Sequence, residues 1–278
     1  MMDAPARRRA RSEPRSRLAG ACLVAAFSLA ACGGAKTEPV APRPRPQLRI
    51  GIAPIYPPLA FKQQGALAGV EVDFAHKLEP ALGVEIVLVE TPWEELIPAL
   101  QQHRIDMIMS GMSITDERRQ LVTFAHPYLR VGQMMLLRRE DAKRLRDDRA
   151  INHPKTRVGF VSGTTGETYV RRHLQLAQAK GLPSVDAAVA ALRAHEIDIF
   201  VHDAPSIYSV TAAEAGKERE LVGRYEPLTE EYLAWAVGKD DDALRVRLDT
   251  VLTAWNADGT LERVLGKWIH VRRKLAPK

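Results

Sequence analysis

One stretch decides the fold class: residues 105–118, which read IDMIMSGMSITDER. Residues 105–109 are almost all apolar, as expected of a buried strand. A turn of small residues follows, and Thr115 is then a good N-cap for a helix. A strand that leads through a short turn into a helix is the building unit of a largely parallel α/β sheet.

The same alternation continues toward the N-terminus. Short apolar or β-branched runs at 48–52 and 84–89 predict strands, and they flank a segment, 70–82, whose apolar residues recur at helical spacing. Gly83 ends that helix as a C-terminal cap. Apolar residues at helical spacing over 93–100 predict the helix that leads into the opening stretch.

A charged stretch at 138–149 interrupts the pattern, which then begins again. We interpret this stretch as a solvated surface beside a hinge. Two copies of one α/β pattern predict two lobes, each a mainly parallel sheet flanked by helices. The second copy comprises strands at 157–161, 183–185 and 197–201, and helices from 167 onward and at 187–194.

Residues 1–31 have the composition of an export signal. Six arginines precede an uncharged apolar run, 18–31, which is shorter than the roughly 20 residues that span a bilayer. The run ends in LAAC, residues 29–32, which matches a lipobox in which Cys32 is lipidated and becomes the mature N-terminus. An ordinary signal with an incidental cysteine is the alternative.

Residues 32–47 follow as a proline-rich tether, because prolines favour extended backbone and little here can be buried. Several acyl chains on Cys32 would anchor the chain stably to a membrane. Gly33, in place of an aspartate after the cysteine, favours the outer membrane. We therefore expect a periplasmic or extracytoplasmic, lipid-anchored protein.

Composition excludes several classes of protein. The 278 residues are 46% hydrophobic and 27% charged, as in a soluble globular protein with a sizeable core. The net charge of +6 falls to about +2 without residues 1–31, so we expect no nucleic-acid partner. The only cysteines are Cys22 and Cys32, and the histidines lack paired metal spacing, so no internal disulfide, metal or cofactor is expected.

Three segments combine residues that suit a zwitterionic ligand. In the opening stretch, Arg118 near a helix start can grip a carboxylate with two charge-assisted hydrogen bonds, although a solvated arginine is the alternative. The loop SGTTGE, 162–167, offers the hydroxyls of Thr164 and Thr165 to a second carboxylate oxygen. Asp203, in the pair His202-Asp203 at a strand end, can hold an ammonium, unless it only caps the following helix.

Several ordered motifs together resemble one family. These are YPP at 56–58, GVEVD at 69–73, WEELIPAL at 93–100, SGMSITDER at 110–118 and HDAP at 202–205. Over about residues 48–269 the chain resembles family 3 extracellular solute-binding proteins, the polar amino-acid receptors of ABC importers. The histidine–aspartate pair resembles the glutamine-binding members in particular.

The resemblance implies a periplasmic-binding-protein type II fold with two hinge crossings. Lobe 1 would comprise 48–136 plus 235–278, and lobe 2 would comprise 137–234. It also implies roles for ten residues. Arg118 would bind the ligand α-carboxylate with Ser113, Thr164 and Thr165; Asp203 would bind the α-ammonium with Ser110 and Gly111; Tyr56 and Trp93 would wall the side-chain pocket, beside His202.

Ala53 departs from the family pattern, because many relatives have an acid there that meets a basic or polar ligand side chain. We therefore expect a ligand other than arginine, lysine or histidine. The predicted function is a monomeric, non-enzymatic receptor that captures a free α-amino acid and delivers it to an ABC permease. Two alternatives stay open: a prephenate or arogenate dehydratase with Glu167 or His202 as general acid, and a sensory binder without a transporter.

Overall fold

The computed structural model describes residues 45–214 and 219–269, which belong to one compact unit. The predicted signal, the lipidation site Cys32 and most of the predicted tether lie outside the described residues. No helix within the described ranges has both the length and the apolar character that crossing a bilayer requires.

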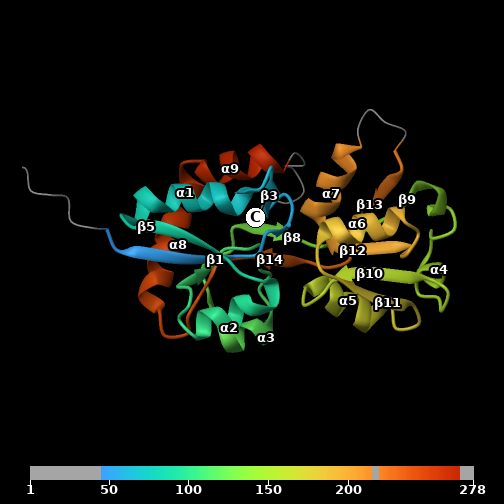
Figure 1. Ribbon diagram of the computed structural model, residues 1–278, viewed down its shortest axis with the longest axis horizontal. Helices are drawn as coiled ribbons and strands as arrows, with labels where there is room; N and C mark the ends of the chain where they lie inside the picture. Colours follow the sequence, from blue (N-terminus) through green and yellow to red (C-terminus); the bar gives the residue numbers. More distant parts are fainter. Residues whose placement is uncertain (1–44, 215–218, 270–278) are drawn as a thin grey trace, which may run out of the picture. The chain divides into compact units, whose positions relative to one another are not determined.

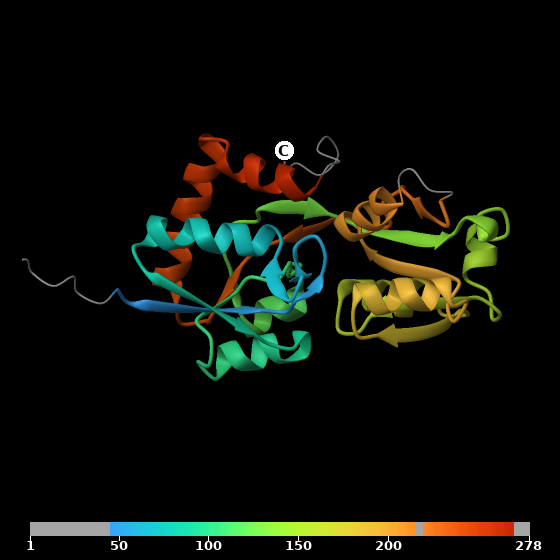
Figure 2. The same cartoon turned by 45° about the horizontal axis from the view of Figure 1, so that its top comes forward.

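Two five-stranded sheets form the framework (Figures 1 and 2). We call the part built on the first sheet lobe 1 and the part built on the second sheet lobe 2. The first sheet has the order β5 (Glu85–Glu90), β1 (Gln47–Ile52), β6 (Met107–Ile108), β15 (Ala236–Val237), β7 (Thr123–Phe124). The second has the order β11 (Gln178–Leu182), β10 (Arg157–Val161), β12 (Ile199–Asp203), β9 (Gln133–Arg138), β13 (Leu221–Arg224).

The two sheets share one pairing pattern. In each, a central strand is parallel to both of its neighbours: β1 to β5 and β6, and β10 to β11 and β12. The other two strand pairings in each sheet are antiparallel: β6 with β15 and β15 with β7 in the first, and β12 with β9 and β9 with β13 in the second. The repeated α/β pattern in the sequence is therefore a repeated architecture, and the predicted two-lobed α/β fold is confirmed. Each sheet is mixed and not mainly parallel as expected, because two of its four strand pairings are antiparallel.

Helices cover the faces of both sheets. In Figures 1 and 2, α1 and α9 lie on one side of the first sheet, and α2 and α3 lie on the other. The predicted cap at Gly83 is present: this glycine has φ of 65° and its N–H donates to the carbonyl of Glu79. Lobe 1 contains α1 (Val70–Leu82), η1 (Trp93–Glu95), α2 (Leu96–Gln101), α3 (Asp116–Leu121), α8 (Asp242–Ala257) and α9 (Thr260–Trp268), and lobe 2 contains η2 (Arg139–Asp141), α4 (Asp148–Ile151), α5 (Thr165–His173), α6 (Val185–Arg193) and α7 (Ala204–Ala213).

Two remaining small sheets lie in and next to lobe 1. A three-stranded meander follows β1, and a two-stranded ribbon joins the lobes. The meander comprises β2 (Ile55–Tyr56), β3 (Ala60–Gln63) and β4 (Ala66–Ala68), and the ribbon comprises β8 (Leu129–Val131) and β14 (Glu231–Leu233).

The ribbon holds both passages of the chain between the lobes. β8 and β14 run antiparallel and pair over three residues each. β9 begins at Gln133 and pairs with β12 in the second sheet, so the first passage falls at Gly132 and not after residue 136 as expected. The apolar run 134–137 suits a buried strand of either lobe, and only its pairing decides between them.

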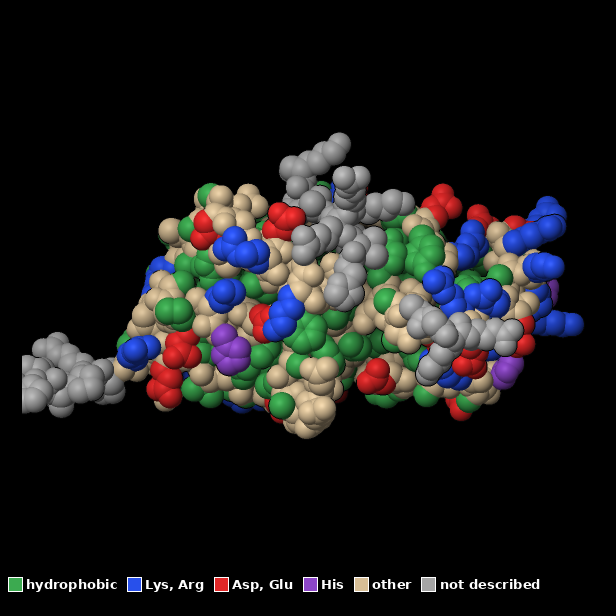
Figure 3. Space-filling model, turned by 90° about the horizontal axis from the view of Figure 1, so that it is seen from above, with side chains coloured by type: hydrophobic (Ala, Val, Ile, Leu, Met, Phe, Trp, Pro, Cys, Tyr) green, Lys and Arg blue, Asp and Glu red, His purple; other side chains and the backbone are tan. Residues whose placement is uncertain are grey.

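Two local expectations were wrong. The strand expected at 183–185 is instead β11, at Gln178–Leu182, because Ser184 caps α6 by accepting from the N–H of Ala187. The stretch 138–149 is not simply a solvated surface, since Arg138 and Leu145 are 3% and 1% exposed. It also lies at the end of β9 away from the ribbon, where lysines and arginines gather in Figure 3.

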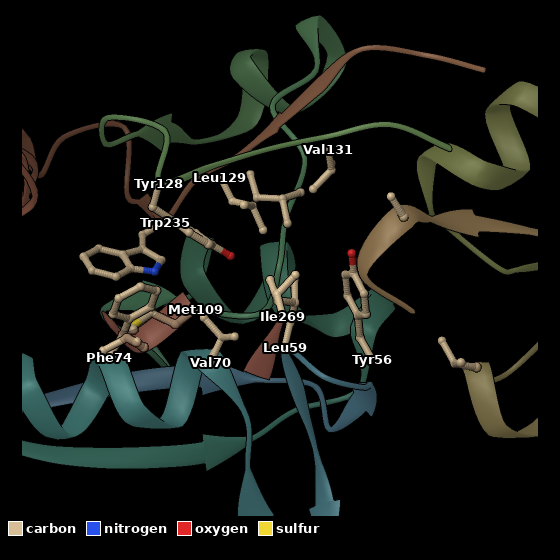
Figure 4. Packing of buried hydrophobic residues seen from close by; sticks show 14 of the residues in the cluster. Tyr56, Leu59, Val70, Phe74, Met109, Tyr128, Leu129, Val131, Trp235 and Ile269 are labelled. Carbon is tan, nitrogen blue, oxygen red and sulfur yellow. The ribbon is translucent and has the colours of Figure 1, made fainter. Parts of the chain in front are cut away.

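A buried carboxylate organises the core of lobe 1. Glu71 on α1 accepts from the hydroxyl of Tyr128 at 2.6 Å, from Nε1 of Trp235 at 3.0 Å and from the N–H of Gly111 at 2.7 Å. Phe74, one turn along α1, packs edge-on against both aromatic rings, with centroids 5.6 Å away in each case (Figure 4). The loop that carries Gly111 is thereby fixed to the core.

Each lobe also contains the same arginine–aspartate clamp. Arg49 at β1 donates its backbone N–H, Nε and Nη2 to Asp106, and Arg157 at β10 donates the same three groups to Asp198. In lobe 2, Arg138 adds a further bond to Asp198 at 3.1 Å. The clamp ties the starts of two neighbouring parallel strands together in each lobe.

The clamp of lobe 2 predicts loss of stability in acid. Burial raises the pKa of Asp198, but hydrogen bonds from the guanidinium and N–H of Arg157 outweigh it, and the pKa falls from 3.8 to about 2. This contribution, about 2 kcal/mol, is present above pH 4 and is lost as the pH falls toward 2. In urea denaturation, Asp198→Asn should lose at least this much stability at pH 7 and show a flatter decline between pH 4 and 2.

The exposed Glu94→Gln serves as the control and should follow the wild type. An Asp198→Asn protein with the stability and acid sensitivity of the wild type would show that the clamp contributes nothing.

Candidate functional site

A small cavity lies between the lobes. Its walls are formed by Ile55, Tyr56, Trp93, Gly111, Ser113 and Arg118 from lobe 1 and by Val161, Thr164, Thr165, His202 and Asp203 from lobe 2. Most of these residues follow the carboxyl ends of parallel strands, where α/β sheets bind ligands. The free volume is about 20 Å³, little more than one water molecule needs, so a small organic molecule can enter only if the lobes separate.

Arg118 reaches the cavity from the first turn of α3. Thr115 caps this helix as predicted, accepting from the N–H of Arg118 at 3.2 Å. The guanidinium donates from Nη1 to the carbonyl of Ser113 at 2.9 Å and from Nη2, across the cleft, to the carbonyl of Gly163 at 3.1 Å. It also lies 5.3 Å from the ring centroid of Trp93, a cation–π contact.

The lobes meet at several further hydrogen bonds. Trp93 donates its Nε1–H to the same Gly163 carbonyl at 3.0 Å, and the hydroxyl of Ser206 donates to the carbonyl of Pro57 at 2.7 Å. The Gly163 carbonyl thus accepts from two lobe 1 side chains at once. The structure is a closed form in which several groups that face the cleft hydrogen-bond across it.

Asp203 ends β12 with its side chain directed into the cleft. It occupies the N-cap position of α7, but its carboxylate makes no capping hydrogen bond. It accepts instead from the hydroxyl of Tyr56 at 2.5 Å, across the cleft, and from Nε2 of Gln133. The capping alternative is therefore wrong, and the carboxylate is free to act in the cavity.

The environment of Asp203 disfavours its ionised form. Burial and the nearby carboxylate of Glu231 raise its pKa from 3.8 to about 7, although Tyr56, Gln133 and Arg118 act in the opposite direction. Burial also lowers the pKa of Arg118, but a guanidinium stays protonated in proteins. The site therefore presents a fixed positive charge and an acid that is near its titration point at neutral pH.

His202 lies beside Asp203 and is 4% exposed. Its ring stands edge-on to that of Tyr56, with centroids 4.8 Å apart. Burial lowers its pKa to about 3, so the imidazole is neutral at physiological pH. Its Nδ1 finds no hydrogen-bond partner among the described residues.

The hydroxyl groups of the predicted site have other partners in this closed form. Thr164 donates to the carbonyl of Val161 at 2.7 Å, and Thr165 accepts from Nε2 of Gln133 at 3.1 Å. Ser113 donates to Glu231 at 2.8 Å. Ser110 alone among the ten predicted residues does not line the cavity, because its Oγ exchanges hydrogen bonds with the backbone of Ala53 at the end of β1.

The sequence analysis did not predict three buried or half-buried polar residues that contact or support the site. Gln133 and Glu231 contact the predicted residues directly, and Glu71 holds Gly111 in place. Glu71 could have been found, since it shares a helix face with Phe74 and Leu78, where an acid is out of place. Gln133 is likewise a polar residue at the start of an apolar strand. Glu231 carries no comparable signal, because acids surround it in the sequence.

Within residues 45–214 and 219–269, no cluster of three or more histidine, aspartate or glutamate side chains could hold a metal ion. The cavity presents a cationic group on one side and an acid on the other. Arg118 comes from lobe 1 and Asp203 from lobe 2, and both face one small space.

Comparison with known proteins agrees with this geometry. The family model for bacterial extracellular solute-binding proteins, family 3, matches residues 48–271. The "Probable histidine-binding protein" of Campylobacter jejuni is 35% identical over 202 residues, which cover 71% of this chain and 75% of that protein.

Two solved ancestral proteins share the fold. The ancestral amino acid-binding protein AncCDT-1, a precursor of cyclohexadienyl dehydratase, is 31% identical, with a TM-score of 0.73 over 80% of this chain and 95% of that one. An ancestral arginine-binding protein, solved with arginine and with glutamine bound, is 26% identical, with TM-scores of 0.75 and 0.74 over 81% of this chain and 99% of that one. With two lobes of matching topology and a charged cavity between them, the chain belongs to the bacterial extracellular solute-binding proteins of family 3.

Proposed function

We propose that this protein captures a free α-amino acid between its lobes and delivers it to an ABC importer. One observation carries the proposal: a guanidinium from lobe 1 and a carboxylate from lobe 2 line the same cavity. An α-amino acid carries the complementary pair of charges on one carbon atom. The histidine-, arginine- and amino acid-binding names of the relatives support the same class of ligand.

Capture would replace contacts between the lobes with contacts to the ligand. In the closed form, Arg118 and Trp93 donate to the carbonyl of Gly163, an acceptor that a ligand carboxylate can replace. A carboxylate is the better acceptor for a guanidinium, because it accepts two charge-assisted hydrogen bonds in parallel. An ammonium would pair with Asp203 on the other lobe, so one molecule would bridge both lobes and favour closure. The ribbon of β8 and β14 is the natural hinge for that movement.

The proposed role of Arg118 can be tested by substitution. In calorimetry with the amino acid that binds best, Arg118→Ala should weaken binding by at least a hundredfold, because the ligand carboxylate would be buried without its charged partner. Arg118→Lys should recover only part of this loss, since an ammonium cannot form the planar pair of bonds. Arg119→Ala, an exposed neighbour on the same helix, is the matched control. Equal affinity of Arg118→Ala and wild type would exclude the assigned role.

The lining of the cavity favours a neutral ligand side chain. Ile55 and Val161 are apolar walls, His202 is neutral, and Ala53 is buried at the end of β1. Among the described residues that line the cavity, Asp203 is the only acid, and the α-ammonium would pair with it. A basic side chain would then enter without a negative partner, which costs several kcal/mol for a buried charge.

A thermal-shift screen of the twenty amino acids and cystine tests the ligand class. Neutral amino acids such as glutamine should raise the melting temperature most, because a ligand that binds only the folded state stabilises it by mass action. The alternative result is strongest stabilisation by a basic amino acid, as the names of the arginine- and histidine-binding relatives would suggest. Stabilisation by arginine, lysine or histidine above all neutral amino acids would overturn the neutral assignment but not the amino-acid one.

The cavity offers little for acid catalysis by the two groups considered for a dehydratase. Burial raises the pKa of Glu167, but hydrogen bonds from the N–H of Gly163 and from Arg171 outweigh it, and the net pKa is lowered. His202 loses its proton near pH 3 and cannot donate one at neutral pH. The dehydratase-related neighbour is itself an amino acid-binding protein. These points support a receptor without catalysis, and we propose in addition that it works as a single chain.

We also propose that the protein is anchored through a lipid on Cys32. The support for this anchor is the signal-like composition of residues 1–31. Cells that are fed a labelled fatty acid should incorporate the label into the wild type and not into Cys32→Ser. Cys22→Ser changes the cysteine that lies outside the LAAC motif, so this variant should keep the label and serves as the control. A Cys32→Ser protein that is still labelled and membrane-bound would contradict the anchor.

A further inference from the structure

An acid–amide–acid network joins Asp203 to the strands that connect the lobes. Nε2 of Gln133 donates to Oδ1 of Asp203 and also lies 3.2 Å from Oε1 of Glu231. Both carboxylates are therefore within hydrogen-bond reach of one amide nitrogen. Two like charges at this separation repel, and the repulsion is strong where water is largely excluded.

Glu231 is fixed in this position by several contacts. Its Oε2 accepts from Ser113 of lobe 1 at 2.8 Å, and its Oε1 accepts from Thr229 at 2.7 Å. It lies on β14, and the loop with Ser113 pairs alongside this strand: Ser113 forms a bridge with Leu233, and the N–H of Ile114 donates to the carbonyl of Tyr232 at 2.9 Å. Glu231 therefore cannot easily turn away from Asp203.

The other groups that face Asp203 do not neutralise both acids. Tyr56 and Tyr128 are phenols with raised pKa values, and His202 is neutral. Arg118 is the one cation that acts on Asp203, and within the described residues it forms no ion pair with Asp203 or Glu231. The ligand-free cleft thus brings two carboxylates toward one cation.

We infer that Glu231 is a positioning residue of the ammonium site: it keeps a proton on Asp203 in the ligand-free cleft, so that ligand capture releases this proton. The inference rests on the proposed amino-acid function. The 2.5 Å contact between Tyr56 and Oδ2 of Asp203 suits either state, because a phenol hydroxyl can donate to a carboxylate or accept from a carboxylic acid. When the ligand ammonium arrives, the O–H bond of Asp203 breaks, the proton passes to solvent and the ammonium keeps its own protons.

The direction of the pH effect follows. A site that must lose a proton binds more weakly in acid, by roughly tenfold for each pH unit below the free-site pKa of about 7. Replacing Glu231 by the isosteric glutamine removes the like charge and keeps a side chain of the same length. The acid limb should then move to lower pH, by roughly one unit.

Calorimetry from pH 5.5 to 8.5 tests this with L-glutamine and L-lysine as probes, since their side chains do not titrate in this range. For the wild type, affinity should rise about tenfold between pH 5.5 and 6.5 and level off above 7.5. Paired buffers of different ionisation enthalpy should show proton release at pH 6. Glu231→Gln should bind more tightly than wild type at pH 5.5 and release fewer protons, whereas Glu230→Gln, an exposed neighbour, should match wild type.

A second measurement needs no ligand and separates the two proposals. An acid with a raised pKa binds its proton more tightly in the folded state, so its stabilising effect is lost as the pH rises from about 4 to about 7. Glu231→Gln should therefore gain stability relative to wild type over this interval. If neither amino acid binds, the stability measurement still tests whether Glu231 raises the pKa of Asp203.

Two results would overturn the inference. One is an identical pH profile of affinity, proton release and stability in wild type and Glu231→Gln. The other is a variant that binds more weakly by the same factor at every pH, which would mean that Glu231 only holds Ser113 in place.

Discussion

The structure depends on how one buried carboxylate is satisfied. Asp203 is 5% exposed at the end of β12, and an ionised carboxylate there is costly unless donors surround it. Its donors come from both sides of the cleft: Tyr56 from lobe 1 and Gln133 from lobe 2. The protonation state of one side chain is thereby linked to the closed arrangement of the lobes. A ligand ammonium would also stabilise the carboxylate of Asp203, so ligand binding and closure of the lobes would be coupled.

The two lobes repeat one architecture and differ where they meet. Both sheets have the same pairing pattern and the same arginine–aspartate clamp at the strand starts, which makes each lobe a rigid half. The equivalent strands end differently: β6 leads into Ser110-Gly111, and β12 ends in His202-Asp203. The lobe 1 side of the cleft thus has small neutral residues at this strand end, whereas the lobe 2 side has an acid. With the proposed function, this asymmetry would decide which end of a zwitterion each lobe receives.

The closed cleft also shows what a ligand must displace. The carbonyl of Gly163 accepts from Arg118 and Trp93, and the hydroxyls of Ser113 and Thr164 are already paired. The two bonds to the Gly163 carbonyl cross the cleft and exchange with water when the lobes part, so their net contribution is modest. Opening therefore leaves groups that water can satisfy, and a ligand with two opposite charges replaces several contacts at once. Reversible capture is a natural consequence of such a balance.

The sequence by itself determined the fold class, the capped helix at 70–82, the helix start at Thr115 and nine of the eleven residues that line the cavity. The fold class and the helix ends follow from apolar periodicity and cap chemistry, and Arg118, Thr164, Thr165 and Asp203 follow from the placement of polar residues at strand ends. The other five lining residues were indicated only by the resemblance to a known family. Only the tertiary structure decided that β9 belongs to lobe 2, that Asp203 does not cap α7, and that Glu231 lies beside it. Each of these depends on a pairing between segments far apart in the chain, and no local pattern encodes which strand an apolar run joins or which acid faces another.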